Sequence, residues 1–357
     1  MNRCSLLPLG IACFFLACGN TGAPAKDYGP LLENLTAQVI LPEQQAFATQ
    51  AKALVVAIQA LSDAPSDDSL LAAQGAWRDA RKAFRITDSL HFGPGLTQYV
   101  TERIDASPVD ASGIEAMASG TGAIDDHAVS VAGGFKKGFL GLEYLLFPDP
   151  SAQGPAPLLA KDAPAPRRRT LAISMADEIA QSAQDLNKAW GPYAEQIRLA
   201  GAGGTQYATQ RAAVDDLVGG AGYALELIVR VRLAPPLGRK SGGAPDPTLD
   251  PTLRSDSAIA DMQASLSGVL ALYADDGFSA VLSKSSPALD EAVKAEFADA
   301  QSKLAAVPAP FASALTDAAS LQLVQDAYTS TQHLKSSWNS DVSSALGATA
   351  RVENDGD

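Results

Sequence analysis

The chain has 357 residues with 40 acidic and 27 basic side chains, which gives a formal net charge of −13. An acidic surface of this kind repels phosphate backbones, so we expect no nucleic-acid partner. Apolar residues make up 46% of the sequence, enough for a packed hydrophobic core. The three cysteines, Cys4, Cys13 and Cys18, lie at the start of the chain, which excludes a disulfide or a thiolate metal site from all that follows.

The first residues are typical of a secretory leader. Residues 1–17 hold one early cation, Arg3, followed by an apolar run that is too short to span a membrane. The run ends in the sequence FLACG, which resembles a bacterial lipobox. We therefore expect a lipoprotein signal peptide over 1–17, lipid attachment at Cys18 and a tether over 18–30. The alternative is an ordinary secretory leader with an incidental cysteine.

After this tether, apolar residues recur at helical spacing and strand-like alternation is nearly absent. One helical stripe consists of Leu70, Ala73, Trp77, Ala80 and Phe84. Similar stripes begin at Leu171, Ile259 and Leu321. The pattern predicts an all-α protein.

Proline and glycine divide the helical part of the chain. Residues 148–166 and 234–252 are rich in proline and predict loops. We expect two bundle-like helical halves packed against each other, one over 31–160 and one over 161–357, with the loop at 234–252 inside the second.

Standard catalytic signatures are missing from the sequence. It has no GxSxG, no P-loop and no HExxH, and its only histidines are His91, His127 and His333. The stretch GFLGLEYLLF at 138–147 instead places Glu143 among apolar residues. A carboxylate buried there needs a cation, a proton or a hydrogen-bond donor, because burying it unpaired costs several kcal/mol.

This stretch resembles the segment G-F-H-x-x-E-Y-L-L-F of the imelysin-like proteins, which are envelope proteins linked to iron uptake, some of them assigned to a metallopeptidase family. Further resemblances follow in order along nearly the whole mature chain, at VILPEQQAF (39–47), AWRDARKAF (76–84), DSLHFGP (88–94), RIDASPVD (103–110), SDSAIADMQASLSGVLALY (255–273) and LGATARVENDGD (346–357). The resemblance implies two related helical bundles, with the motif lining a cleft between them.

The chain departs from the family at one motif position. Gly138 and Glu143 match, but Leu140 stands where the family has a histidine. The residues that the resemblance places along the cleft are Gly138, Leu140, Arg103, Asp105 and Trp77, with a position in the core as the alternative for Trp77. The loss of one metal ligand also argues against hydrolysis by a metal-bound water.

Other residues could compensate for the missing histidine. Asp88 and His91 are three residues apart, and with Glu143 from a facing helix they would make a three-ligand site for iron or another divalent cation. In the alternative, Glu143 pairs with a buried arginine, Arg81 or Arg103, His91 is an ordinary loop histidine, and no cofactor is bound.

Three functions follow from these expectations. The first is a lipid-anchored binding protein of the bacterial envelope in iron or other metal acquisition, with the envelope membrane and iron-uptake components as partners. An outer-membrane position facing the periplasm is preferred. The second is a metallopeptidase, and the third is a scaffold that binds a peptide or protein without metal. The missing motif histidine favours a protein that is not an enzyme.

Overall fold

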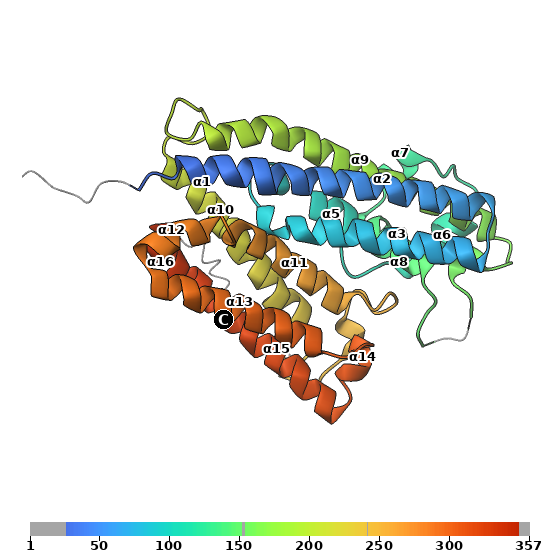
Figure 1. Cartoon of the computed structure of the whole chain (residues 1–357). Helices are drawn as coiled ribbons and strands as arrows, with labels where there is room; N and C mark the ends of the chain where they lie inside the picture. The colour runs from blue at the N-terminus through green and yellow to red at the C-terminus, as the bar shows by residue number, and fades with distance from the viewer. Residues whose placement is uncertain (1–25, 152–153, 241, 350–357) are drawn as a thin grey trace, which may run out of the picture.

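The computed structural model describes residues 26–151, 154–240 and 242–349 (Figure 1). Across these ranges every regular element is a helix and no strand occurs, which confirms the predicted all-α class. None of the helices described is long and apolar enough to cross a membrane. The predicted signal peptide and Cys18 lie outside the described residues, whereas the end of the predicted tether enters a helix at Gly29.

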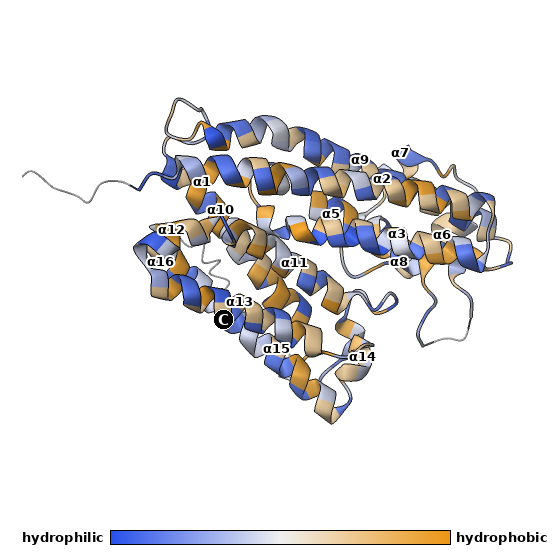
Figure 2. Ribbon diagram, viewed as in Figure 1, coloured by the Kyte–Doolittle hydropathy of each residue, from blue (hydrophilic) through white to orange (hydrophobic). Residues whose placement is uncertain are grey.

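The first bundle is built on three long helical segments. Helix α2 packs lengthwise against both α3 and α9, and hydrophobic and hydrophilic residues alternate along all three, so that each has an apolar and a polar face (Figure 2). Ser66 caps α3 by accepting a hydrogen bond from the backbone N–H of Ser69. The segments are α1 (Gly29–Asn34), the π-helix η1 (Leu35–Ile40) and α2 (Leu41–Asp63), which follow one another directly, then α3 (Asp67–Ile86) and α9 (Ala165–Arg198).

Short helices between α3 and α9 close the remaining side of this bundle. Helix α8 packs on both α3 and α9, and α5, α6 and α7 pack on α9. The elements are η2 (Thr87–Leu90), α4 (Pro94–Thr97), α5 (Val100–Ile104), α6 (Ala111–Ser119), α7 (Asp126–Ser130), η3 (Gly134–Lys136), α8 (Gly138–Leu146) and η4 (Pro157–Leu159).

The second bundle lies obliquely against the first, in yellow to red in Figure 1. Helix α11 packs between α3 of the first bundle and α10 and α13 of its own, and α13 packs on α15. The elements are α10 (Gln210–Glu226), the π-helix η5 (Leu227–Leu233), η6 (Pro247–Leu249), α11 (Ala258–Tyr273), α12 (Phe278–Ser285), α13 (Pro287–Ala306), α14 (Phe311–Ala314), α15 (Ala318–Ser337), the π-helix η7 (Trp338–Val342) and α16 (Ser343–Leu346).

The packing divides the chain later than the sequence predicted. The proline-rich loop before residue 161 was expected to separate the bundles, but α9 follows that loop and packs along α2. The reason is that α9 carries a buried stripe, including Ile179, Leu186 and Trp190, that faces the first bundle's core. The separation therefore falls between α9 and α10.

The two bundles meet at η2, where glycines allow an unusually close approach. A Cβ atom added at Gly268 of α11 would lie 2.0 Å from the carbonyl oxygen of Ile86. One added at Gly220 of α10 would lie 2.4 Å from the carbonyl oxygen of Ser89. Because real Cβ atoms do not approach oxygen this closely, both helices need glycine to reach the turn between them.

We predict that Gly268→Ala destabilises the protein by about 1–3 kcal/mol, since the added methyl group forces α11 away from α3. The matched control is Gly75→Ala in α3, where an added Cβ meets nothing within 4 Å. Alanine there should stabilise the helix by up to about 1 kcal/mol. Urea denaturation of both variants measures the difference, and an undiminished unfolding free energy for Gly268→Ala would contradict the close contact.

Candidate functional site

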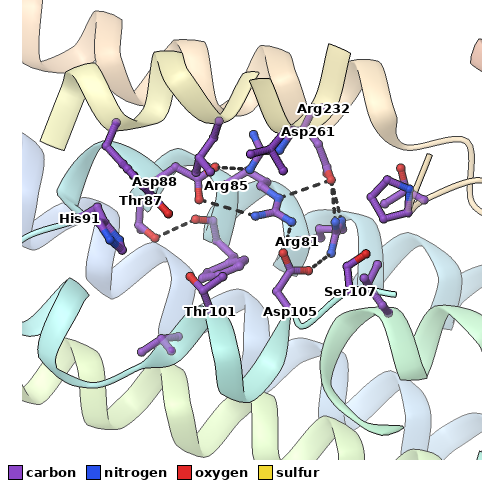
Figure 3. A pocket seen from close by; sticks show the side chains of 18 of the residues that line it. Arg81, Arg85, Thr87, Asp88, His91, Thr101, Asp105, Ser107, Arg232 and Asp261 are labelled. Carbon is purple, nitrogen blue, oxygen red and sulfur yellow. Dashed lines mark hydrogen bonds and ion pairs between the residues drawn. The ribbon is translucent and has the colours of Figure 1, made fainter. Parts of the chain in front are cut away.

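A cavity of about 210 Å³ lies where the bundles meet (Figure 3). The first bundle supplies its walls from α2, α3, η2 and α5, and the second from α10, η5, the 249–252 segment and α11. Seven of its lining residues are arginine or aspartate, which is unusual for a space between packed helices. The site therefore combines a charged part of the wall with an apolar one.

Three arginines and three aspartates form a network along the wall of this cavity. Arg81 donates to Asp105 Oδ1 at 2.6 Å and to Asp261 Oδ2 at 2.8 Å. Arg85 donates to Asp105 Oδ2 and also lies against Asp261, with Nε 3.4 Å from Oδ2. Arg232 Nη2 donates to Asp88 Oδ2 at 2.6 Å. Figure 3 shows the pairs side by side, and together they join α3, η2 and α5 to η5 and α11.

These ion pairs are buried, so their contribution to stability differs from that of surface pairs. The six side chains are between 1% and 9% exposed. Burial lowers the pKa of Arg85, but the charges of Asp105, Asp88 and Asp261 outweigh it and hold that pKa above its ordinary value. Burial and the neighbouring Arg85 instead lower the pKa of Arg232. Removing one member of such a network leaves an uncompensated buried charge, which costs far more than an exposed pair contributes.

Glu143 lies beside this network, in an adjoining groove of about 520 Å³. Its side chain is buried, and Oε1 accepts a hydrogen bond from the backbone N–H of Ser255 at 2.8 Å. Burial raises the pKa of Glu143 to about 7, although the Ser255 hydrogen bond and the charge of Arg81 oppose the rise. Asp250, which lines both spaces, has its pKa raised by burial to about 6.

The structure does not assemble the three predicted metal ligands into one site. Asp88 is paired with Arg232, His91 stacks on Tyr223 with ring centroids 3.8 Å apart, and Glu143 is bonded to Ser255. Across the described ranges, no group of three or more His, Cys, Asp or Glu side chains is placed to hold a metal ion. The alternative prediction was an ion pair between Glu143 and an arginine. Arg81 instead donates its hydrogen bonds to Asp105 and Asp261, so its charge acts on Glu143 only from a distance.

The residues predicted to line a cleft have different positions. Leu140 lines both the cavity and the groove, and Asp105 lines the cavity. Trp77 is instead a core residue that donates through Nε1 to the carbonyl oxygen of Phe139 at 3.0 Å. Arg103 pairs with Glu178 of α9 at 3.2 Å.

Gly138 has a backbone role at the start of α8. Its φ is +70°, and a Cβ there would lie 2.2 Å from the carbonyl oxygen of Ile104. A left-handed conformation and a close neighbour both require glycine. This residue therefore sets the position of the helix that carries Leu140 and Glu143.

The sequence reasoning missed several residues of the site. Arg85 lies about one helical turn after Arg81, a charge spacing that an amphipathic pattern assigns to a solvent face. Asp88 was predicted as a metal ligand, but the structure pairs it with Arg232. Arg232 and Arg230 lie in the otherwise apolar run LIVRVRL, and this pattern could have indicated a buried arginine. Gln44 and Asp250 carried no signal in the sequence alone.

Comparison with known proteins decides the family. The family model described as Imelysin matches residues 40–338, which is most of the chain and spans both bundles. The chain belongs to the imelysin family. The resemblance inferred from the motif segments is thereby confirmed.

Individual imelysin relatives agree with this. "Iron-regulated protein A" of Synechococcus elongatus is 25% identical over 315 residues, covering 84% of this chain and 81% of that protein. A crystal structure of an imelysin-like protein from Psychrobacter arcticum has a TM-score of 0.73 at 17% identity and covers 91% of this chain and 96% of its own. A structure assigned as an iron-regulated protein A precursor from Parabacteroides distasonis has a TM-score of 0.71 at 18% identity, with 88% and 97% covered.

The imelysin motif is incomplete in this chain, and the residues present do not fit a metal there. Leu140 offers no lone pair at the motif's histidine position, and Glu143 is a buried carboxyl whose pKa is raised. Of the aspartates nearby, Asp88 and Asp105 pair with arginines, and Asp250 accepts hydrogen bonds from Thr252. A metal centre needs several such donors at one point, so no step of a reaction is assigned to a metal at this motif.

We predict that Leu140→His creates a metal site, because the imidazole would lie one helical turn before Glu143 and near Asp250. Purified protein should then hold about one zinc or iron ion per chain by elemental analysis, whereas the natural sequence should hold far less. The double variant Leu140→His, Glu143→Gln is the control and should lose the gained metal. Equal metal in all three proteins would contradict this interpretation of the motif.

We also predict that stability falls as pH rises from about 4.5 to about 7. The pKa of Glu143 is about 7 in the folded protein and 4.5 ordinarily, so the native state keeps this proton to higher pH than the unfolded state does. The stabilisation that the proton provides is therefore complete below pH 4.5 and is lost as the pH rises through 7. The loss amounts to about 2–3 kcal/mol. Glu143→Gln should remove this part of the slope in denaturation curves measured across the range, leaving a smaller decline from Asp250, and an unchanged slope would contradict the assignment.

Proposed function

We propose that this imelysin is a lipid-anchored protein of the bacterial envelope that serves the acquisition of iron or another metal and binds a ligand between its two bundles. The observation that carries the proposal is the cavity with buried charged side chains at the seam, since buried polar groups of this kind are costly to keep unless they are used. The name of the Synechococcus elongatus relative, "Iron-regulated protein A", supports the link to iron.

Binding is favoured over peptide hydrolysis by the chemistry of the motif. A metallopeptidase holds an ion through several protein donors and keeps one position open for water. Here Leu140 replaces one donor, and Asp88 and Asp105 are committed to arginines. The charged lining also favours a small ligand over the dry apolar cleft that a peptide-binding scaffold would need.

The proposed location rests on the start of the sequence. The FLACG stretch supports lipid attachment at Cys18, and the polar residues after it support a tether. Gly19 follows the cysteine in place of the aspartate associated with inner-membrane retention, which favours the outer membrane, facing the periplasm. The acidic balance suits a partner or cargo that carries positive charge.

A deletion strain tests this proposal. Growth in iron-depleted medium and uptake of radioactive iron should fall several-fold when the gene is deleted. The natural protein should restore both, and the Cys18→Ser variant should restore neither, because it lacks the lipid anchor. Iron uptake that is unaffected by the deletion would overturn the proposed role, and full rescue by Cys18→Ser would overturn the anchor.

A further inference from the structure

One polar side chain in the cavity has no role in the network. Gln44, on α2, is 0% exposed and lines the cavity. Neither its Nε2 nor its Oε1 has a hydrogen-bond partner among the described residues. A buried donor or acceptor without a partner costs about 1–3 kcal/mol, and Gln44 has both, so its presence indicates a group that it meets in the cavity.

The charges around Gln44 restrict what this group can be. The three arginines of the network, Arg81, Arg85 and Arg232, are matched by three aspartates, Asp88, Asp105 and Asp261, so the network itself is neutral. Asp250 adds one further carboxyl to the lining. An anionic ligand would therefore add to an uncompensated negative charge in a buried space. A neutral polar molecule carries no such cost.

The rest of the wall is apolar and partly aromatic. Phe84, Val100, Leu186 and Leu227 line the cavity, which also contains the stacked rings of His91 and Tyr223. A volume of about 210 Å³ is several times the roughly 30 Å³ that one water molecule occupies. The space therefore has room for a small organic molecule with an apolar body.

The carboxamide of Gln44 presents a donor and an acceptor side by side. The complementary partner has an acceptor next to a donor with the same spacing, which is the edge of a second amide in the cis arrangement. A carboxylic acid has the same pattern only when protonated, and at neutral pH it is ionised in water. A ring amide meets the pattern without charge.

We propose that the cavity binds a small uncharged molecule with a cis-amide edge, such as a lactam ring, and that Gln44 recognises this edge through two hydrogen bonds. Nε2 donates to the ligand's carbonyl oxygen, and Oε1 accepts from its N–H. The ring lies against the apolar wall. This inference rests on the proposed use of the cavity as a binding site and adds the chemical class of its ligand.

The test uses 2-piperidone as the probe, with the whole mature protein labelled with ¹⁵N. Titration should shift the side-chain NH₂ resonance of Gln44 in the NMR spectrum with saturation in the millimolar range. N-methyl-2-piperidone, which lacks the N–H donor, should bind at least about tenfold more weakly, and so should glutarate, which is charged. Equal binding of all three compounds would overturn the inference.

Gln44→Leu separates recognition from folding. Leucine has a similar size and no polar atoms, so the variant should melt at a higher temperature than the natural protein because the unpaired amide is gone. Its affinity for 2-piperidone should fall at least about tenfold. A variant that is more stable and binds the probe as well as before would overturn the inference, because Gln44 would then contact only water.

Failure here and failure of the proposed function are distinguishable. If 2-piperidone leaves the natural protein's spectrum unchanged while the deletion strain loses iron uptake, the ligand class is wrong and the envelope role stands. If the probe binds through Gln44 and the deletion strain takes up iron normally, the cavity is a ligand site of a protein with another role.

Discussion

Buried charge at the seam is the constraint on which the rest of the structure depends. Arg81 and Arg85 pair with Asp105 inside the first bundle, but Asp261 and Arg232 of the second bundle form their ion pairs with residues of the first. Each ion pair is stable only with its partner in place, because desolvation would otherwise dominate. The network thus fixes how the bundles face each other, and the cavity, the groove and the position of Glu143 follow from that arrangement.

The backbone around the network is adapted to the same arrangement. The short turn η2 places Asp88 against Arg232, and the turn fits only because α10 and α11 offer glycine where they cross it. Gly138 likewise allows the start of α8 to pack closely against the end of α5. The glycines and the charged residues therefore depend on each other, since the glycines permit the short distances that buried ion pairs require.

The sequence allowed the fold class, the family and the burial of Glu143 to be predicted, but not the site's electrostatics. Helical periodicity and the ordered motif segments are local patterns, and both depend on residues close in sequence. The pairing of Arg81 with Asp261 joins residues 180 positions apart, which one sequence cannot show. The same limit explains α9. Its stripe from Leu171 and the proline-rich loop before it were visible in the sequence, but only the packing shows that the stripe faces α2.

The shared network has a consequence for the evolution of this fold. The two bundles are separate in the chain, yet Arg232 and Asp261 on one side and Arg85 and Asp88 on the other form one electrostatic unit. A recombination event that exchanged the second bundle for that of a distant homologue would mismatch this unit unless all four side chains were inherited together. An exchanged second bundle would keep the network intact only if it brought an arginine and an aspartate to the positions of Arg232 and Asp261.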